Sequence, residues 1–250
     1  YNSPNFGLCA DDSCFIYLSS CIIQNISLFG IAVTCFSNFY AQQCQFIDIK
    51  NEHVFLDNDS NATCVECVFD KSNRRAFNVA NKSSATIDKC EIKNCKEGAL
   101  IANRCDKILV INSHIHHLDY SAIYLDKTMG IIKKTTINNC NGNGVNITHH
   151  SKAIITQCLF HNTVYPAVAI CEKSFSLVQK CEIKDSQMSG LIVRFASKAK
   201  IENCLISNSK TFGVCISDSK GVGIIKTLIN GSGETAINAY NHSNVFVKDS

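Results

Sequence analysis

Apolar residues recur along this chain with a period of 23 residues, which is shortened once to 22. A Cys, Ser or Thr marks one position of the repeat, and the position two residues later is Ile or Phe in every repeat. The positions three residues before the marker, and ten and twelve residues after it, are also apolar. The markers are Cys21, Cys44, Cys67, Cys90, Ser113, Thr135, Cys158, Cys181, Cys204 and Thr227. Such regular self-similarity indicates a solenoid built from one repeated unit.

Within each repeat the apolar positions form pairs two residues apart, which is the spacing of side chains on one face of a strand. The stretches between these pairs, such as KNCKEG and SNSKTFG, are rich in residues that favour turns. Three strands of about three residues per repeat predict one coil of a parallel β-helix. Leucine-rich repeats need a different leucine spacing, and left-handed β-helices have hexapeptide repeats. We therefore predict an all-β, right-handed parallel β-helix of about ten coils of 22–23 residues.

The composition is consistent with one continuous domain over residues 1–250, because two prolines and twelve glycines provide no linker. A net charge of +3 with 18% charged residues is too mild for a nucleic-acid-binding protein. No apolar run is long enough to span a membrane. The chain begins with Tyr1 and the repeats run to both ends. We expect a monomeric fragment of a longer chain, with both end caps outside it.

The repeat columns C-x-I-x-N, G-[IVL]-x-[VI] and S-x-x-x-I resemble the right-handed β-helix repeats of the pectin-lyase-like superfold. They are most similar to the repeats of eukaryotic F-box β-helix proteins and related scaffold proteins, and the resemblance covers essentially the whole chain. Members of this superfold include lyases, hydrolases, adhesins and non-catalytic recognition domains, so the resemblance implies a fold more strongly than a function. It also implies that the strand ten to twelve residues after the marker lines the groove where the enzymes bind polysaccharide.

The outward side chains of this groove strand supply the candidate ligand-binding residues. The set consists of Phe55, Asp57, Tyr124, Asp126, Asn146 and Arg194. Asp57 and Asp126 are three coils apart, about 14 Å at the ladder spacing, whereas paired glycosidase carboxylates are roughly 5 to 9.5 Å apart. We therefore expect no catalytic residue on the strand itself, although turn residues could still contribute. Tyr124, Asp126 and Asn146 form either a small sugar-binding patch or a solvated sheet face.

A second set of outward positions is apolar in the middle coils. It consists of Leu109, Ile111, Ile131, Ile154 and Leu177. An exposed apolar stripe of this kind indicates either a surface for a partner or a region covered by a flanking segment.

The sixteen cysteines and the histidines were also candidates for special chemistry. Seven cysteines occupy the inward marker position, where free Cys packs as a small hydrophobe, so we expect reduced thiols and an intracellular location. Seven N-x-[ST] sequons keep an extracellular location open. In the segment HIHH, His114 and His116 point outward, and His161 lies two coils further on, about 10 Å away. These three are too far apart to share one ion, so we predict no metal and no cofactor.

Taken together, the sequence favours a non-catalytic recognition scaffold that binds a protein or glycan partner. The alternatives are a carbohydrate-active enzyme, either a polysaccharide lyase or a glycoside hydrolase, and a surface adhesin of the same fold.

Overall fold

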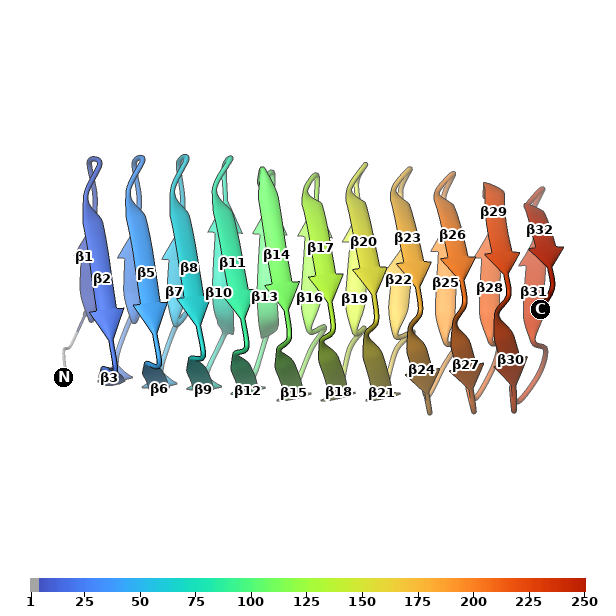
Figure 1. Ribbon diagram of the computed structural model, residues 1–250, viewed down its shortest axis with the longest axis horizontal. Coiled ribbons are helices and arrows are strands. Elements are labelled where there is room, and N and C mark those ends of the chain that lie inside the picture. Colours follow the sequence, from blue (N-terminus) through green and yellow to red (C-terminus); the bar gives the residue numbers. More distant parts are fainter. Residues whose placement is uncertain (1–4) are drawn as a thin grey trace.

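The computed structural model describes residues 5–250, which form strands joined by turns and contain no helix. Each coil contributes one strand to each of three parallel sheets, and the coils stack along the long axis of the molecule (Figure 1). The described residues form sheets of 11, 11 and 10 strands. The prediction of a parallel β-helix with about ten coils and three strands per coil is therefore confirmed. Within these residues, no helix is long and apolar enough to cross a membrane.

The three sheets are named A, B and C in the order in which the chain first enters them. Sheet A contains β1 (Leu8–Ala10), β4 (Ile31–Val33), β7 (Val54–Leu56), β10 (Arg75–Ala80), β13 (Gly98–Asn103), β16 (Ile123–Asp126), β19 (Val145–Thr148), β22 (Val168–Ile170), β25 (Leu191–Arg194), β28 (Val214–Ser217) and β31 (Ile237–Tyr240). Sheet B contains β2 (Phe15–Ser19), β5 (Asn38–Gln42), β8 (Asn61–Val65), β11 (Ser84–Asp88), β14 (Lys107–Ile111), β17 (Met129–Lys133), β20 (Lys152–Thr156), β23 (Phe175–Gln179), β26 (Lys198–Glu202), β29 (Lys220–Ile225) and β32 (Asn244–Lys248). Sheet C contains β3 (Ile22–Ile26), β6 (Gln45–Ile49), β9 (Val68–Ser72), β12 (Glu91–Cys95), β15 (His114–Leu118), β18 (Thr136–Cys140), β21 (Leu159–Thr163), β24 (Glu182–Lys184), β27 (Leu205–Ser207) and β30 (Leu228–Asn230).

Equivalent residues of successive coils lie directly beside one another. In sheet C, for example, Ile92 pairs with Ile115, and Ile115 pairs with Ile137. These side chains are fully buried, so each apolar column of the sequence becomes a continuous stack inside the coil. The periodicity sets this register because a coil of constant length returns each residue to the same place.

Most strands of sheets B and C have five residues, so the predicted length of about three is too short there. The alternation of side chains explains the difference. A five-residue strand of sheet B, such as β14, carries two inward apolar residues, Ile108 and Val110, and three outward residues. The two apolar residues of a pair, with the residue between them, form only the middle of the strand. Ladder hydrogen bonds extend the strand by one residue at each end.

The marker residues have a hydrogen-bonding role at the corner between sheets B and C. The Cys90 N–H donates to Ser113 Oγ at 3.1 Å, and that hydroxyl donates to the Ile111 carbonyl at 2.8 Å. Lys89, just before the marker, has a φ of 52°, so the chain turns sharply here. A small side chain that both donates and accepts is needed at this corner, which explains why Cys, Ser and Thr alternate in one column.

Candidate functional site

The outer face of sheet A brings together three of the predicted ligand-binding residues. Tyr124 and Asp126 lie on β16, and Tyr124 pairs in register with Asn146 on β19. Phe55 and Asp57 lie three coils away and make other contacts. The Phe55 ring lies 5.0 Å from that of Phe29, and Asp57 Oδ1 accepts a hydrogen bond from a nearby asparagine amide at 2.7 Å. The structure therefore leaves this pair outside the Tyr124 patch.

Two residues that the sequence analysis missed complete this patch. His149 Nδ1 lies 3.3 Å from Asp126 Oδ2, and His149 Nε2 lies 2.8 Å from Glu172 Oε2. The Thr148 hydroxyl also donates a hydrogen bond to Glu172. The three residues come from three successive coils, and the His149 imidazole lies between the Asp126 and Glu172 carboxylates. We call Tyr124, Asp126, Asn146, His149 and Glu172 the groove patch.

The local backbone explains how His149 and Glu172 reach this position. Both residues follow strands of sheet A and have φ values of 50° and 55°. In this left-handed conformation a side chain does not follow the inward and outward alternation of the strand. Strand alternation predicts which strand positions face outward, but it does not predict where side chains in the turns point. The sequence signal that could have identified this pair is that His149 and Glu172 lie one repeat of 23 residues apart, in equivalent turns.

Burial makes the groove patch electrostatically unusual. The Asp126 side chain is 17% exposed, and its Oδ1 atom is buried without a hydrogen-bond partner among residues 5–250. Burial raises the pKa of the Tyr124 phenol, and the charges of Asp126 and Glu172 raise it further. The patch therefore carries two carboxylates beside a neutral phenol that is free to donate a hydrogen bond.

Arg194, the last predicted residue, lies three coils beyond Asp126 but on the same outward column. Between them stands Cys171, whose pKa burial raises to about 11 in spite of the nearby guanidinium. Arg194 Nε is buried and has no hydrogen-bond partner in the described part of the chain. This part of the column thus has an unpartnered acceptor atom at Asp126 and, three coils on, an unpartnered donor atom at Arg194.

The surface beside this column is apolar. Ala169, Ile192 and Cys215, from successive strands of sheet A, form a small buried cluster on the outer face, with Phe212 packed against it. The turns that lead into β16, β22 and β25 carry exposed apolar side chains. They include Tyr120, Tyr165 and Met188, which are 61%, 51% and 40% exposed. Near the groove patch, the outer face of sheet A therefore has apolar side chains on the sheet, exposed apolar residues at the turns before the strands, and His149 and Glu172 at the turns after them.

An ionic cluster lies at the start of β10 and β13, on the aromatic side of this face. Arg74 Nη1 lies 3.2 Å from Glu52 Oε1, and Arg74 Nε lies 3.2 Å from Glu97 Oε2. Arg75 also pairs with Glu97. The Glu52 side chain is fully buried, so these contacts serve to hold a buried carboxylate in the turn.

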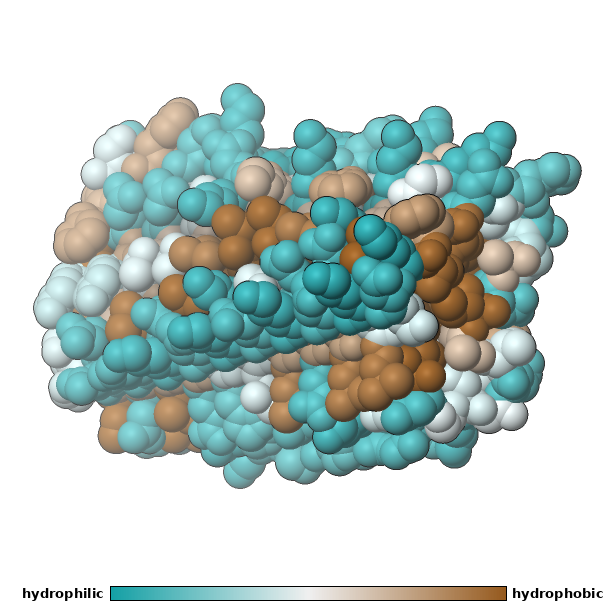
Figure 2. All heavy atoms as spheres, turned by 45° about the vertical axis from the view of Figure 1, so that its right-hand side comes forward, coloured by the Kyte–Doolittle hydropathy of each residue, from teal (hydrophilic) through white to brown (hydrophobic). Residues whose placement is uncertain are grey.

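The predicted apolar stripe forms a continuous row on the outer face of sheet B. Leu109 pairs with Ile131, Ile131 with Ile154, and Ile154 with Leu177. Ile111 lies two residues beyond Leu109 on the same face of β14. Beside the row, exposed Met129, Lys152, Phe175 and Lys198 are neighbours in register. On the face that Figure 2 shows, a ridge of hydrophilic residues runs along the molecule with hydrophobic patches on either side.

The structure separates the histidines that the sequence analysis considered together. His114 and His116 lie on β15, while His161 lies on β21, two coils away, where its Nε2 is 2.9 Å from Asp185 Oδ2. His116 contacts Glu91 instead. All sixteen cysteines have free thiols in this structure.

A family model described as right handed beta helix region matches residues 1–109, 29–177 and 166–250. The chain belongs to this family. The match confirms the predicted handedness, and it does not distinguish F-box β-helix proteins from other members. A sequence comparison with curated proteins finds no match.

Solved structures show the same fold. The catalytic unit of a thermostable GH87 alpha-1,3-glucanase from Streptomyces thermodiastaticus strain HF3-3 is 11% identical, with a TM-score of 0.61 over 97% of this chain. The catalytic domain of GH87 alpha-1,3-glucanase in complex with nigerose is 10% identical, with a TM-score of 0.59 over 95% of this chain. This β-helix spans 62% of each of those chains. At such low identity the likeness concerns the fold alone.

Proposed function

We propose that this β-helix is a glycan-recognition scaffold that binds a polar polymer across the outer face of sheet A. The observation that carries the proposal is the groove patch, where an aromatic ring lies beside two carboxylates and an imidazole on a continuous sheet face. Hydroxyl-rich ligands suit such a surface, because apolar and aromatic side chains cover the ligand while a few placed polar groups fix its orientation.

The buried atoms of this face support a ligand with many hydroxyl groups. Asp126 Oδ1 is an unpartnered acceptor and Arg194 Nε an unpartnered donor within the described chain. A buried polar atom without a partner costs free energy, and sugar hydroxyls both donate and accept hydrogen bonds. Asp126 and Arg194 are three coils apart, about 14 Å at the ladder spacing, so an extended ligand of several units would reach both.

The fold neighbours are consistent with this proposal and do not carry it. Two of them are glucanase domains, and one of these was solved with nigerose. They provide a practical first ligand class, the alpha-1,3-glucans, for a panel of polysaccharides.

Binding is tested by affinity electrophoresis and calorimetry against such a panel. We expect Tyr124→Ala and Glu172→Gln each to weaken binding of the recognised glycan at least tenfold. Tyr17→Ala and Glu202→Gln, on the outer face of sheet B, are the matched controls and should leave the affinity within twofold. Failure of every panel glycan to bind, or an equal loss in the sheet B variants, would contradict the proposal.

A glycoside hydrolase is the second candidate, and the two carboxylates of the groove patch favour it. Asp126 Oδ2 and Glu172 Oε2 contact the same imidazole ring, so they lie closer together than the roughly 10 Å that separates their backbones across two coils. This brings them within the roughly 6.5 to 9.5 Å between the carboxyl groups of inverting glycosidases. His149 contacts both carboxylates and would orient them. Release of reducing ends from a bound glycan that is abolished by Asp126→Asn or Glu172→Gln would establish hydrolysis. Binding of a glycan without release of reducing ends would support the non-catalytic scaffold over the hydrolase.

A further inference from the structure

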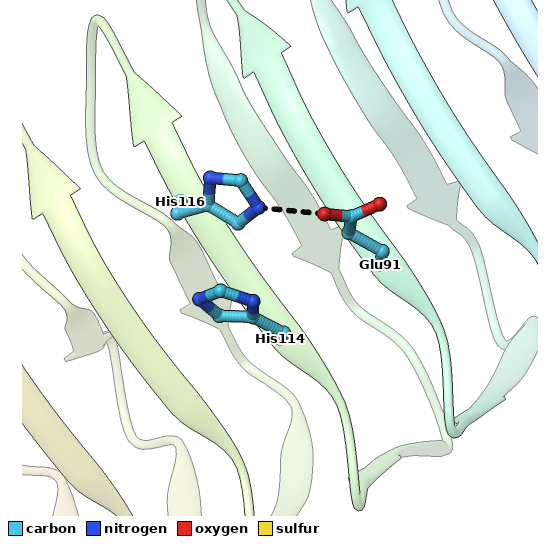
Figure 3. A group of neighbouring side chains, drawn as sticks. All are labelled: Glu91, His114 and His116. Atoms are coloured by element: carbon cyan, nitrogen blue, oxygen red, sulfur yellow. Dashed lines mark hydrogen bonds and ion pairs between the residues drawn. The ribbon is translucent and has the colours of Figure 1, made fainter.

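Three side chains with metal-ligating atoms lie together on the outer face of sheet C, away from the groove patch (Figure 3). Glu91 comes from β12, and His114 and His116 come from β15 of the next coil. The two histidines share a face because they are two residues apart on one strand. Glu91 pairs in register with His114, so the coil stacking brings the carboxylate to the imidazoles.

The ligand atoms of these residues all lie within 4.8 Å of one another. His116 Nε2 is 3.0 Å from Glu91 Oε1, which is the contact drawn as a dashed line in Figure 3. The rings of His114 and His116 are stacked, with centroids 4.1 Å apart and planes inclined by 27°. Both rings therefore lie beside the same carboxylate.

Neighbouring polar groups hold the three side chains in place. His117 Nδ1 lies 2.6 Å from His116 Nδ1, and Lys93 Nζ lies 2.8 Å from Glu91 Oε2. Asn138 Nδ2 lies 3.2 Å from His114 Nε2. Such contacts restrain the three side chains, as hydrogen bonds to ligands do in metal sites.

We propose that Glu91, His114 and His116 bind one divalent transition-metal ion, with zinc as the test ion. Two imidazoles and a carboxylate are a donor set that zinc and its first-row neighbours accept, whereas calcium and magnesium prefer oxygen ligands alone. In a tetrahedral zinc site, ligand atoms about 2.1 Å from the ion lie about 3.4 Å apart. The ligand atoms lie within 4.8 Å of one another, and small side-chain rotations of the exposed His114 and the half-buried Glu91 bring them to the separation that zinc requires.

The proposed site has two structural consequences. The ion would link two successive coils, since Glu91 lies on β12 and both histidines lie on β15. Its fourth position would face solvent, because three protein ligands leave one position of a tetrahedral zinc site for water or another ligand.

The site is tested by calorimetric titration of metal-free protein with zinc. The background carries Cys9→Ser and Cys14→Ser, because these two thiols are exposed and thiolates are zinc ligands that would compete with the proposed site. We expect one bound ion per chain, and we expect His114→Ala, His116→Ala and Glu91→Gln each to weaken it at least tenfold. His161→Ala is the matched control, because His161 lies on the same outward column as His116 and pairs with a carboxylate. It should leave the affinity within twofold.

Cobalt provides a second readout, which reports the kind of ligand atom that binds the ion. Cobalt bound by nitrogen and oxygen ligands should give visible absorption without a thiolate charge-transfer band, and this absorption should disappear in His116→Ala. Circular dichroism of the variants checks that the fold persists. Absence of zinc binding in the Cys9 and Cys14 background, or unchanged binding in His116→Ala, would overturn the proposal.

Discussion

At the scale of single residues, His53 in the turn that leads into β7 combines full burial with an incomplete set of hydrogen-bond partners. His53 is fully buried, its Nε2 lies 3.3 Å from the Asp70 carbonyl oxygen, and its ring lies at the edge of Phe69. Its Nδ1 has no hydrogen-bond partner among residues 5–250. Burial lowers the pKa of His53 from 6.5 to about 4, and the Asp70 carbonyl opposes this only in part. The residue is therefore neutral in the folded protein near neutral pH.

This buried histidine predicts a stability loss on mild acidification. Below about pH 6.5 the unfolded chain binds a proton at His53 that the folded protein does not bind until about pH 4. The unfolded state then binds more protons, so the free energy of unfolding falls as the pH falls through this window. The shift corresponds to about 3 kcal/mol. We expect wild-type protein to lose this amount relative to His53→Gln between pH 7 and pH 4, measured by urea denaturation.

Other titrating groups are common to both proteins in that comparison and cancel. A difference between wild type and His53→Gln that stays constant from pH 7 to pH 4 would show that His53 gains its proton equally in both states.

At the scale of elements, a cluster of phenylalanine rings joins the three sheets in the N-terminal coils. Phe39 lies on β5 of sheet B, Phe46 and Phe69 lie on β6 and β9 of sheet C, and Phe77 lies on β10 of sheet A. Phe46 and Phe69 are stacked at 4.8 Å, and Phe69 meets Phe77 edge to face at 4.7 Å. Phe69 is fully buried and contacts rings of two sheets, so it connects β9 to β10 across the interior.

Removal of the Phe69 ring should therefore destabilise the protein strongly. We expect Phe69→Ala to lower the free energy of unfolding by about 3 to 5 kcal/mol, because it removes a large buried ring and leaves a cavity. Phe15→Ala on the outer face of β2 is the control, since Phe15 is 64% exposed. It should change stability by less than about 0.5 kcal/mol. Denaturation followed by circular dichroism measures both, and similar losses in the two variants would contradict this role of the cluster.

At the scale of the whole molecule, stability is shared between neighbouring coils. The inward Ile115, Ile137 and Phe160 of the middle coils are at most 1% exposed. In contrast, the inward Leu18 and Val245 of the first and last coils are only partly buried, because each has a neighbour on one side. In a solenoid each repeat is stabilised by its own contacts and by its interfaces with adjacent repeats.

This arrangement predicts a gradient of hydrogen exchange along a protein of these 250 residues. Amides of β12 to β18 should exchange most slowly, and those of β1 to β3 and β30 to β32 at least tenfold faster, because the terminal coils can open locally. Mass spectrometry of peptides after timed exchange measures the gradient. Equal protection in terminal and middle coils would indicate that the chain unfolds as one unit.

Much of this organisation was predictable from the sequence, and the groove patch contains both predicted and unpredicted residues. Tyr124 and Asn146 were predicted to be neighbours because both lie on outward strand positions one coil apart. His149 and Glu172 were not predicted, since their left-handed backbone turns the side chains away from strand alternation. Glu91 lies one repeat of 23 residues before His114, so the periodicity predicts that the two are neighbours. The sequence-based prediction compared the histidines only with one another and therefore omitted Glu91.

The sequence by itself determined the coil, the three strands within it and the stacks of buried side chains. These follow from alternation along a strand and from a constant repeat length, which are local properties. Tertiary structure alone decided that His149 meets Asp126 and Glu172, because these contacts depend on turn conformation and on the single coil of 22 residues. Because that coil has 22 residues, Asp126 pairs in register with Thr148, and His149 lies one residue further on. The turn conformation nevertheless brings His149 into contact with Asp126.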